Sequence, residues 1–145
     1  MKKKLIIVLG LVLVVGLGGA YKLVLAKKPA KEKIAGQVYV LPKDFLVNLA
    51  DGRFAKLDVA LVLEKGYSAK PAGGEGAAEP PEGFGTLPEE AAVRDIVTGV
   101  ITDASGRTLI SRSGRERLKR RILRQIQRST DVEATAVLFT DVAVQ

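Results

Sequence analysis

The residues able to do chemistry in this chain are few, and their spacing fits no catalytic pattern. Ser111 and Ser113 precede Lys119, but neither lies at the S-x-x-K spacing of a serine nucleophile with a lysine base, and a lysine on a surface helix keeps an ordinary charge. Glu89 and Glu90 are expected to stabilise a helix N-terminus rather than to transfer protons. The chain has no His and no Cys, which removes the usual general base, the thiolate nucleophile and ordinary zinc sites. We therefore expect a protein that is not an enzyme and that uses no cofactor or metal.

The strongest charge signal is the stretch "SRSGRERLKRRILRQIQRST", residues 111–130, which carries eight Lys or Arg and one Glu. Basic residues outnumber acidic ones by eight to one in residues 1–33 and by nine to four in residues 107–145, whereas residues 34–106 carry six basic and eleven acidic residues. A basic helix can bind an acidic protein surface or anionic lipid, or it can present a solvated face. The stretch lacks interleaved aromatic residues for base stacking, so nucleic acid is not expected as a partner.

The N-terminal stretch "MKKKLIIVLGLVLVVGLGGAYKLVLAKK" predicts a membrane anchor. Seventeen uncharged residues run from Leu5 to Tyr21, and with Lys22 reaching the interface the run extends to Ala26. At about 1.5 Å per residue the longer run spans roughly 33 Å, which is enough for a bilayer core. Cleavage of a signal peptide after Ala20 is the alternative. The expected anchor, within residues 1–26, is formed by Leu5, Ile6, Ile7, Val8, Leu9, Leu11, Val12, Leu13, Val14, Val15, Leu17 and Tyr21.

Two signals disagree on the orientation of this span. Three lysines precede it, and five lie at or after its end, so the positive-inside count favours a cytoplasmic C-terminus. The short lysine-rich head instead resembles the n-region of an export signal, which stays inside while the rest is exported. We expect the exported orientation, with the N-terminus in the cytoplasm.

A small folded domain is predicted over residues 37–145, after a charged linker at residues 27–36. Two runs of period two are joined through Asp51-Gly52 and predict an antiparallel hairpin. Residues 66–87 are rich in Gly, Ala and Pro and predict a flexible loop. The side chains expected to face the core from the hairpin are Phe45, Val47, Leu49, Leu57, Val59, Leu61 and Leu63.

Two helices and a strand are expected after the loop. The first helix follows Pro88, and its apolar stripe comprises Val93, Ile96, Val97, Val100 and Ile101. The second is expected to start near Gly114 behind a capping box of Ser113 and Glu116. Its core stripe is Leu118, Ile122 and Ile126, and a separate basic arc is formed by Arg117, Arg121, Arg124 and Arg128. The final β-branched run predicts a central strand, which gives an α+β domain with helices packed on one sheet face.

Several stretches together carry a resemblance to a known family. After the lysine-tipped span come "FLVNLADGRFAKLDVALVLE", "AAVRDIVTGVITD", "GRERLKRRILRQI" and "VLFTDVAVQ". Each is mostly a hydrophobic pattern, but their order, the Arg94-Asp95 pair, the "FTD" and the final Gln are more specific. In this combination the chain resembles the FliL family of flagellar basal-body-associated proteins.

The resemblance implies a single-pass protein of the bacterial inner membrane, with its C-terminal domain in the periplasm at the flagellar basal body. It further implies a domain similar to stomatin and prohibitin domains. Homo-oligomeric rings around stator units, and support of torque, motility or swarming, are implied as well. The subunit or stator contacts expected from it are Arg94, Asp95, Arg117, Arg121, Arg124 and Arg128. The long insertion at residues 66–87 and the short linker depart from the family pattern. A membrane-tethered module whose basic helix binds anionic lipid or nucleic acid is the alternative.

Overall fold

A long central strand, β3 (Phe54–Leu63), organises the sheet. The computed structural model describes residues 34–69 and 82–145, and residues 34–145 form one compact unit. Along β3, Leu57, Val59, Leu61 and Leu63 are completely buried on one face, while Lys56 on the opposite face is exposed. Successive side chains of a strand point to opposite faces, so the period-two pattern produces this division. The predicted core face of this strand is confirmed.

Three strands pair with β3, all antiparallel. β1 (Val38–Val40) and β2 (Phe45–Asn48) pair with successive parts of it, from Val38 opposite Val62 to Asn48 opposite Phe54. β4 (Ala134–Val144) pairs with β3 along nearly its whole length. The predicted hairpin is therefore confirmed as β2 and β3, whereas β1 was not predicted, because three residues carry too little pattern to be recognised.

The prediction that the final strand is central is wrong. Among the described residues β4 pairs with β3 alone, so β3 is the central strand and β4 is an edge strand. A β-branched run free of Gly and Pro is equally compatible with both positions. The apolar residues of β4 reflect burial on one face, where Ala134 and Val137 are buried, rather than pairing at both edges.

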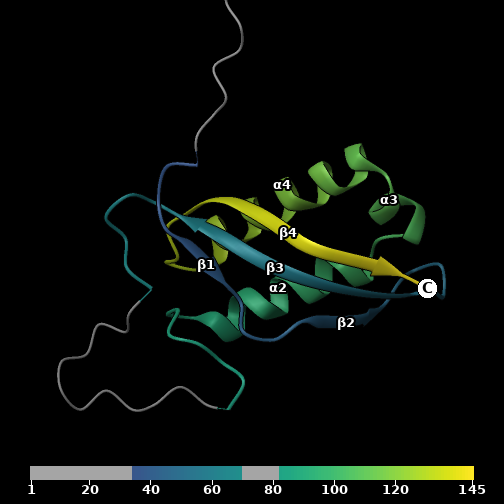
Figure 1. Cartoon of the computed structure of the whole chain (residues 1–145), viewed down its shortest axis with the longest axis horizontal. Helices are drawn as coiled ribbons and strands as arrows, with labels where there is room; N and C mark the ends of the chain where they lie inside the picture. Colours follow the sequence, from purple (N-terminus) through teal and green to yellow (C-terminus); the bar gives the residue numbers. More distant parts are fainter. Residues whose placement is uncertain (1–33, 70–81) are drawn as a thin grey trace, which may run out of the picture. The chain divides into compact units, whose positions relative to one another are not determined.

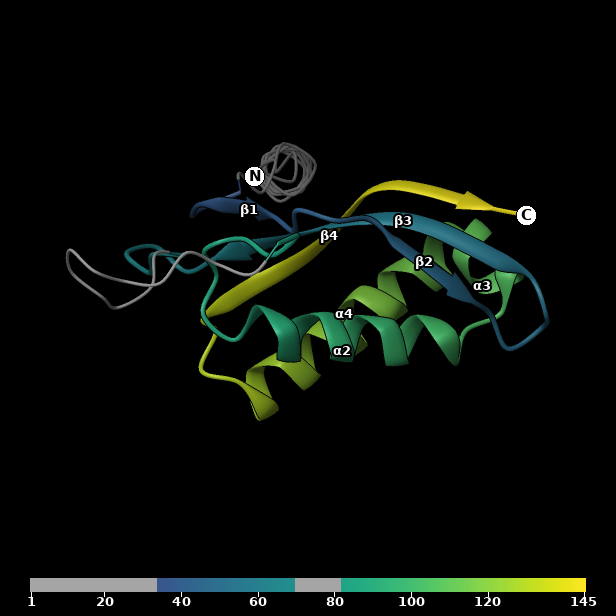
Figure 2. The same ribbon diagram turned by 90° about the horizontal axis from the view of Figure 1, so that it is seen from below.

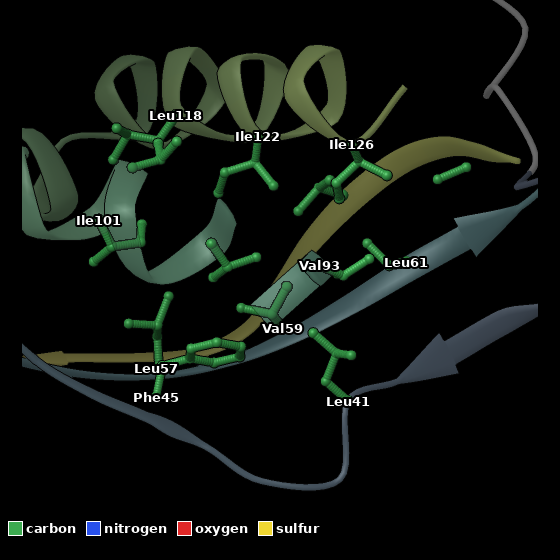
Figure 3. Packing of buried hydrophobic residues seen from close by; sticks show 14 of the residues in the cluster. Leu41, Phe45, Leu57, Val59, Leu61, Val93, Ile101, Leu118, Ile122 and Ile126 are labelled. Carbon is green, nitrogen blue, oxygen red and sulfur yellow. The ribbon is translucent and has the colours of Figure 1, made fainter. Parts of the chain in front are cut away.

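Three helices cover one face of the sheet, as Figures 1 and 2 show for α2 (Glu90–Thr102), α3 (Gly106–Ile110) and α4 (Arg112–Ser129). The predicted α+β architecture with a one-sided helix layer is thus confirmed. In the close view of the core, Leu118, Ile122 and Ile126 of α4 point toward the sheet, with Val93 of α2 and Leu61 of β3 close by (Figure 3). All the side chains predicted to face the core are buried except Ile96, which is partly buried.

The start of the last helix differs from the prediction. The expected capping box of Ser113 and Glu116 does not form; instead Ser111 caps α4, with its Oγ accepting a hydrogen bond from the Gly114 backbone N–H at 3.0 Å. The short helix α3, which was not predicted, ends at Ile110 and places Ser111 in the extended conformation that an N-cap needs. Two serines spaced two residues apart are both plausible caps, and the preceding helix decides between them.

The β2–β3 turn is tied to the helix layer. Gly52 has φ +79°, a left-handed conformation that glycine adopts readily, which explains the Asp51-Gly52 signal. Asp51 Oδ2 accepts a hydrogen bond from the Gly106 N–H at 2.9 Å, and the Ala50 N–H donates to the Ala104 carbonyl at 3.0 Å. These contacts connect the turn to the start of α3.

The predicted anchor and linker, apart from residues 34–36, lie outside the described residues, as does the middle of the predicted loop, residues 70–81. No helix within the described part of the chain has the length and apolar character needed to cross a bilayer. The described flanks of the loop carry no helix or strand, yet Ala69 and Leu87 are each only 4% exposed. Both ends of that loop are therefore attached to the core.

Candidate functional site

The outward side of α4 carries a row of arginines. At about 100° per residue, Arg117, Arg120, Arg124 and Arg128 fall on the side opposite the buried stripe of this helix, and all four are exposed. None of them forms an ion pair within residues 34–69 and 82–145. We call these four residues the basic face. Unpaired cations close together on one rigid helix attract an anionic partner.

Sequence reasoning identified three members of the basic face and missed Arg120. It included Arg121, whose guanidinium instead forms an ion pair with Asp103 of the α2 C-cap at 3.1 Å. Arg120 lies four residues before Arg124 and three after Arg117, so helical spacing carried the signal needed to find it. The structure thus places Arg120 on one surface with Arg117, Arg124 and Arg128, and the role of all these arginines and of Arg121 as subunit or stator contacts stays a prediction.

Two other basic residues of α4, Arg115 and Lys119, form contacts within the domain. The Arg115 guanidinium donates to the carbonyls of Leu109 and Ile110 at 2.9 and 2.7 Å, which satisfies the end of α3. Lys119 bonds to Glu116 at 2.7 Å, and this hydrogen bond is the main reason why the pKa of the Glu116 carboxyl lies below its ordinary value. With Lys119 bound to Glu116 and the Ser111 hydroxyl used as a cap, the structure does not assemble a serine–lysine pair.

A groove of about 400 Å³ runs between the outer surfaces of α2 and α4. Its lining includes Asp95, Gly99, Asp103 and Arg121. Two predicted contact residues from different helices, Asp95 and Arg121, therefore line one surface feature. Gly99 is exposed here, and a Cβ at this position would meet no atom within 4 Å.

The structure separates Arg94 from its neighbour Asp95. The Arg94 guanidinium lies 4.4 Å from the centre of the Phe45 ring and donates hydrogen bonds to the carbonyls of Lys43 and Asp44 at 3.1 and 3.4 Å. These carbonyls belong to the segment between β1 and β2. Arg94 therefore holds this segment against α2, and it forms no ion pair with Asp95.

A buried carboxylate occupies the start of α2. Glu90 is 4% exposed, and its Oε2 accepts hydrogen bonds from the Tyr39 hydroxyl at 2.7 Å and from the Gly85 N–H at 2.9 Å. Burial raises the pKa of Tyr39 above its ordinary value of 10.0, and the hydrogen bond to Glu90 raises it further. Sequence reasoning assigned Glu90 to the helix dipole alone. A tyrosine 51 residues away gives no local signal of this contact.

Carboxylates gather where β3 and α4 end and α2 and β4 begin. Glu64, Tyr67, Asp131 and Glu133 line a hollow of about 700 Å³, and Glu89 reaches its border, where its Oε1 accepts from the Asp131 N–H at 3.0 Å. Burial raises the pKa of Tyr67, and Glu133, Glu89 and Asp131 raise it further by their charges. We call Glu64, Glu89, Asp131 and Glu133 the carboxylate hollow. None of the four has an ion-pair partner among the described residues.

The chain thus forms a small α+β domain with a basic and an acidic surface. Residues 38–145 match the model of the family described as flagellar basal body-associated protein FliL, so the chain belongs to that family. It is therefore an accessory protein associated with the flagellar basal body. The resemblance noted from the sequence is confirmed by this match. None of the curated proteins matches the chain.

Proposed function

We propose that this chain is a membrane-anchored accessory subunit of the flagellar motor, with its folded domain in the periplasm. In this proposal the domain assembles with further copies around stator units and supports torque and swimming. The observation that carries the proposal is the family match over residues 38–145. The basic face adds support, because unpaired charge on a rigid helix is suited to binding another protein.

The proposed anchor rests on the sequence. The apolar run from Leu5 to Tyr21, continued past Lys22 to Ala26, has the length of a bilayer span, and the lysine-rich head precedes it. Ten residues of charged linker, 27–36, then separate it from the folded domain. A tethered domain beside the motor needs this arrangement.

A deletion strain tests the function and the topology together. The gene is deleted and then restored with a periplasm-sensitive reporter fused after Gln145, and swimming and reporter activity are both scored. We expect swimming to be impaired on deletion and restored with an active reporter. A silent reporter would contradict the periplasmic location and would favour a cytoplasmic module that binds lipid or nucleic acid. Unimpaired swimming of the deletion strain would contradict the motor role.

The basic face is tested by charge reversal in the same strain. Arg120→Glu with Arg124→Glu is expected to impair swimming while protein level and helix content stay unchanged, because both side chains are exposed and unpaired. The matched control is Arg107→Glu with Arg112→Glu, which makes the same charge change at exposed arginines outside the basic face. Equal swimming of the two variants would remove the basic face from the proposal.

A further inference from the structure

We propose that two surfaces of this domain are complementary to each other across copies: the basic face of one copy docks into the carboxylate hollow of the next. The partner of the basic face is therefore a second copy of this chain. This inference rests on the self-association in the proposed function and specifies the contact that produces it.

The first argument is charge complementarity. The basic face presents Arg117, Arg120, Arg124 and Arg128, and the carboxylate hollow presents Glu64, Glu89, Asp131 and Glu133. Lys65 also lines the hollow, so its four carboxylates leave an excess of three negative charges against the four positive charges of the basic face. Neither set is neutralised by an ion pair among the described residues. Arginine forms bidentate hydrogen bonds with carboxylates, so a contact between these surfaces gains directional bonds as well as Coulomb attraction.

The second argument is the shape of the carboxylate hollow. It is a depression of about 700 Å³ that includes the ring of Tyr67, and arginine side chains bind well to such a surface because guanidinium groups stack on aromatic rings. Burial raises the pKa of Tyr67, and the charges of Glu133, Glu89 and Asp131 raise it further. Within the described chain no three carboxylates are placed so that they could hold a metal ion. Separate carboxylates can each accept hydrogen bonds from a guanidinium group.

The third argument is that the start of the basic face lies too far from the carboxylate hollow of its own copy, and that Arg128, at the other end, forms no ion pair with it. Both surfaces belong to one compact unit, and α4 is a rigid helix packed on the sheet by Leu118, Ile122 and Ile126. Arg117 lies twelve residues before the end of α4 at Ser129, a distance of about 18 Å along the helix axis. The carboxylate hollow begins beyond that end, so the start of the basic face cannot reach it in the same molecule.

The geometry of such a contact is head-to-tail. The basic face and the carboxylate hollow are different surfaces, so each copy offers one to its predecessor and the other to its successor. A contact between different surfaces repeats and forms a closed ring when its rotation closes. Because it joins exposed charges, the contact is expected to weaken as salt is raised, since the Debye length falls from about 8 Å at 0.15 M to about 3 Å at 1 M.

The test is a charge-swap experiment on the full-length chain in its membrane. The arginine set is Arg120→Glu with Arg124→Glu, the carboxylate set is Glu64→Arg with Glu133→Arg, and the control is Arg107→Glu with Arg112→Glu. Using arginine in the carboxylate set leaves the lysines unchanged, so an amine-reactive cross-linker reports self-association equally in every variant. Resistance to limited proteolysis shows that each variant is folded.

The expected result is a loss of cross-linked species of about tenfold in each set alone, which corresponds to about 1.4 kcal/mol. Cross-linking should return when both sets are placed in one chain, and also when the two single-set chains are expressed together. The control should resemble the wild type. If the arginine set proves sensitive to protease, Arg120→Gln with Arg124→Gln replaces it. This variant should give an amount of cross-linked species between that of the wild type and the tenfold loss.

Three results would overturn the inference. The first is wild-type cross-linking in either single set, and the second is loss without return in the combined chain. The third is a basic face that binds phosphatidylglycerol vesicles while self-association is unaffected by the swaps, which would identify lipid as its partner. If the wild-type chain itself gives no cross-linked species, the self-association in the proposed function also fails, whereas a swimming defect on deletion would still support the motor role.

Discussion

At the scale of single residues, Tyr39 and Glu90 form a polar contact that the core depends on. The Tyr39 hydroxyl donates to Glu90 Oε2 at 2.7 Å and also accepts from the Leu87 N–H at 3.3 Å. Removing it leaves a buried carboxylate with one donor fewer. We expect Tyr39→Phe to lower the free energy of unfolding by about 1–3 kcal/mol, measured by urea unfolding followed by circular dichroism. Tyr67→Phe is the matched control and should change it little, because no hydrogen bond of the Tyr67 hydroxyl is found among the described residues.

The same tyrosine predicts a pH dependence. Burial and the bond to Glu90 raise the pKa of Tyr39 in the folded state above 10.0, so the folded state holds this proton more tightly than the unfolded state. The stabilisation that results from this raised pKa is complete below pH 10 and is lost as the pH rises through the folded-state pKa of Tyr39. In urea unfolding between pH 9 and 11, stability should fall less steeply in Tyr39→Phe than in the wild type. If the free energy of unfolding fell equally steeply with pH in both proteins, the raised pKa of Tyr39 would be contradicted.

Arg94 was predicted to be a contact residue, and the structure shows that it already has partners within the domain. Its guanidinium stacks on Phe45 and bonds to two carbonyls between β1 and β2. We expect Arg94→Ala to lower the free energy of unfolding by about 1–3 kcal/mol, since two carbonyls lose a charged donor. Asp95→Ala, one residue further and exposed, should change it by less than about 0.5 kcal/mol. If Arg94→Ala impaired swimming at wild-type stability, the contact role would be favoured instead.

At the scale of elements, the start of α4 provides a paired prediction. Ser111 caps the helix, whereas Ser113 lies exposed in its first turn. Ser111→Ala should lower the free energy of unfolding by about 1 kcal/mol, the usual effect of losing an N-cap, and Ser113→Ala should leave it nearly unchanged. Thermal unfolding of the two variants measures the difference. If Ser113→Ala were the more destabilising of the two, the capping box of Ser113 and Glu116 predicted from the sequence would be favoured instead.

Two helical glycines should respond in opposite directions to alanine. Gly99 in α2 has open space where the methyl group of an alanine would lie, so Gly99→Ala should stabilise by up to about 1 kcal/mol through helix propensity. A Cβ at Gly114 would collide with the Thr108 carbonyl oxygen and lie 2.6 Å from Ser111 Oγ, so Gly114→Ala should destabilise despite the same propensity. Urea unfolding compares them. We therefore expect the α3–α4 junction to require glycine at position 114, and the α2–α4 groove to accept alanine at position 99.

The elements predicted correctly from the sequence are those with a repeated apolar pattern. The elements α2, α4 and β3 each have ten residues or more, so one misplaced residue does not obscure their apolar pattern. β1 and α3, with three and five residues, are too short to show a period. Their positions are set by contacts with distant parts of the chain, such as Val38 with Val62, and propensity does not reveal these.

At the scale of the whole molecule, only half of the candidate interaction surface was predictable. The basic face was visible because its residues share one helix, and helical spacing converts sequence into surface position. The carboxylate hollow was not, because Glu64, Glu89 and Glu133 come from three segments that meet only in the folded domain. In the sequence its members appear as scattered surface charges. Surfaces assembled from several segments need the fold before they can be recognised.

The interruption between β1 and β2 affects how the sheet opens. Residues 42–44 leave the edge, so one side of β3 is covered by two short strands. Each strand has one contact with α2, Tyr39–Glu90 for β1 and Arg94–Phe45 for β2, but β2 also has two buried side chains whereas β1 has none. Amide hydrogens of β1 should therefore exchange with solvent through local opening, those of β2 more slowly, and those of β3 only when the domain unfolds. Hydrogen-exchange mass spectrometry measures this order, and equal protection of β1 and β2 would contradict it. That edge of the sheet then behaves as two separately opening units, of which the one nearer residue 34 releases first.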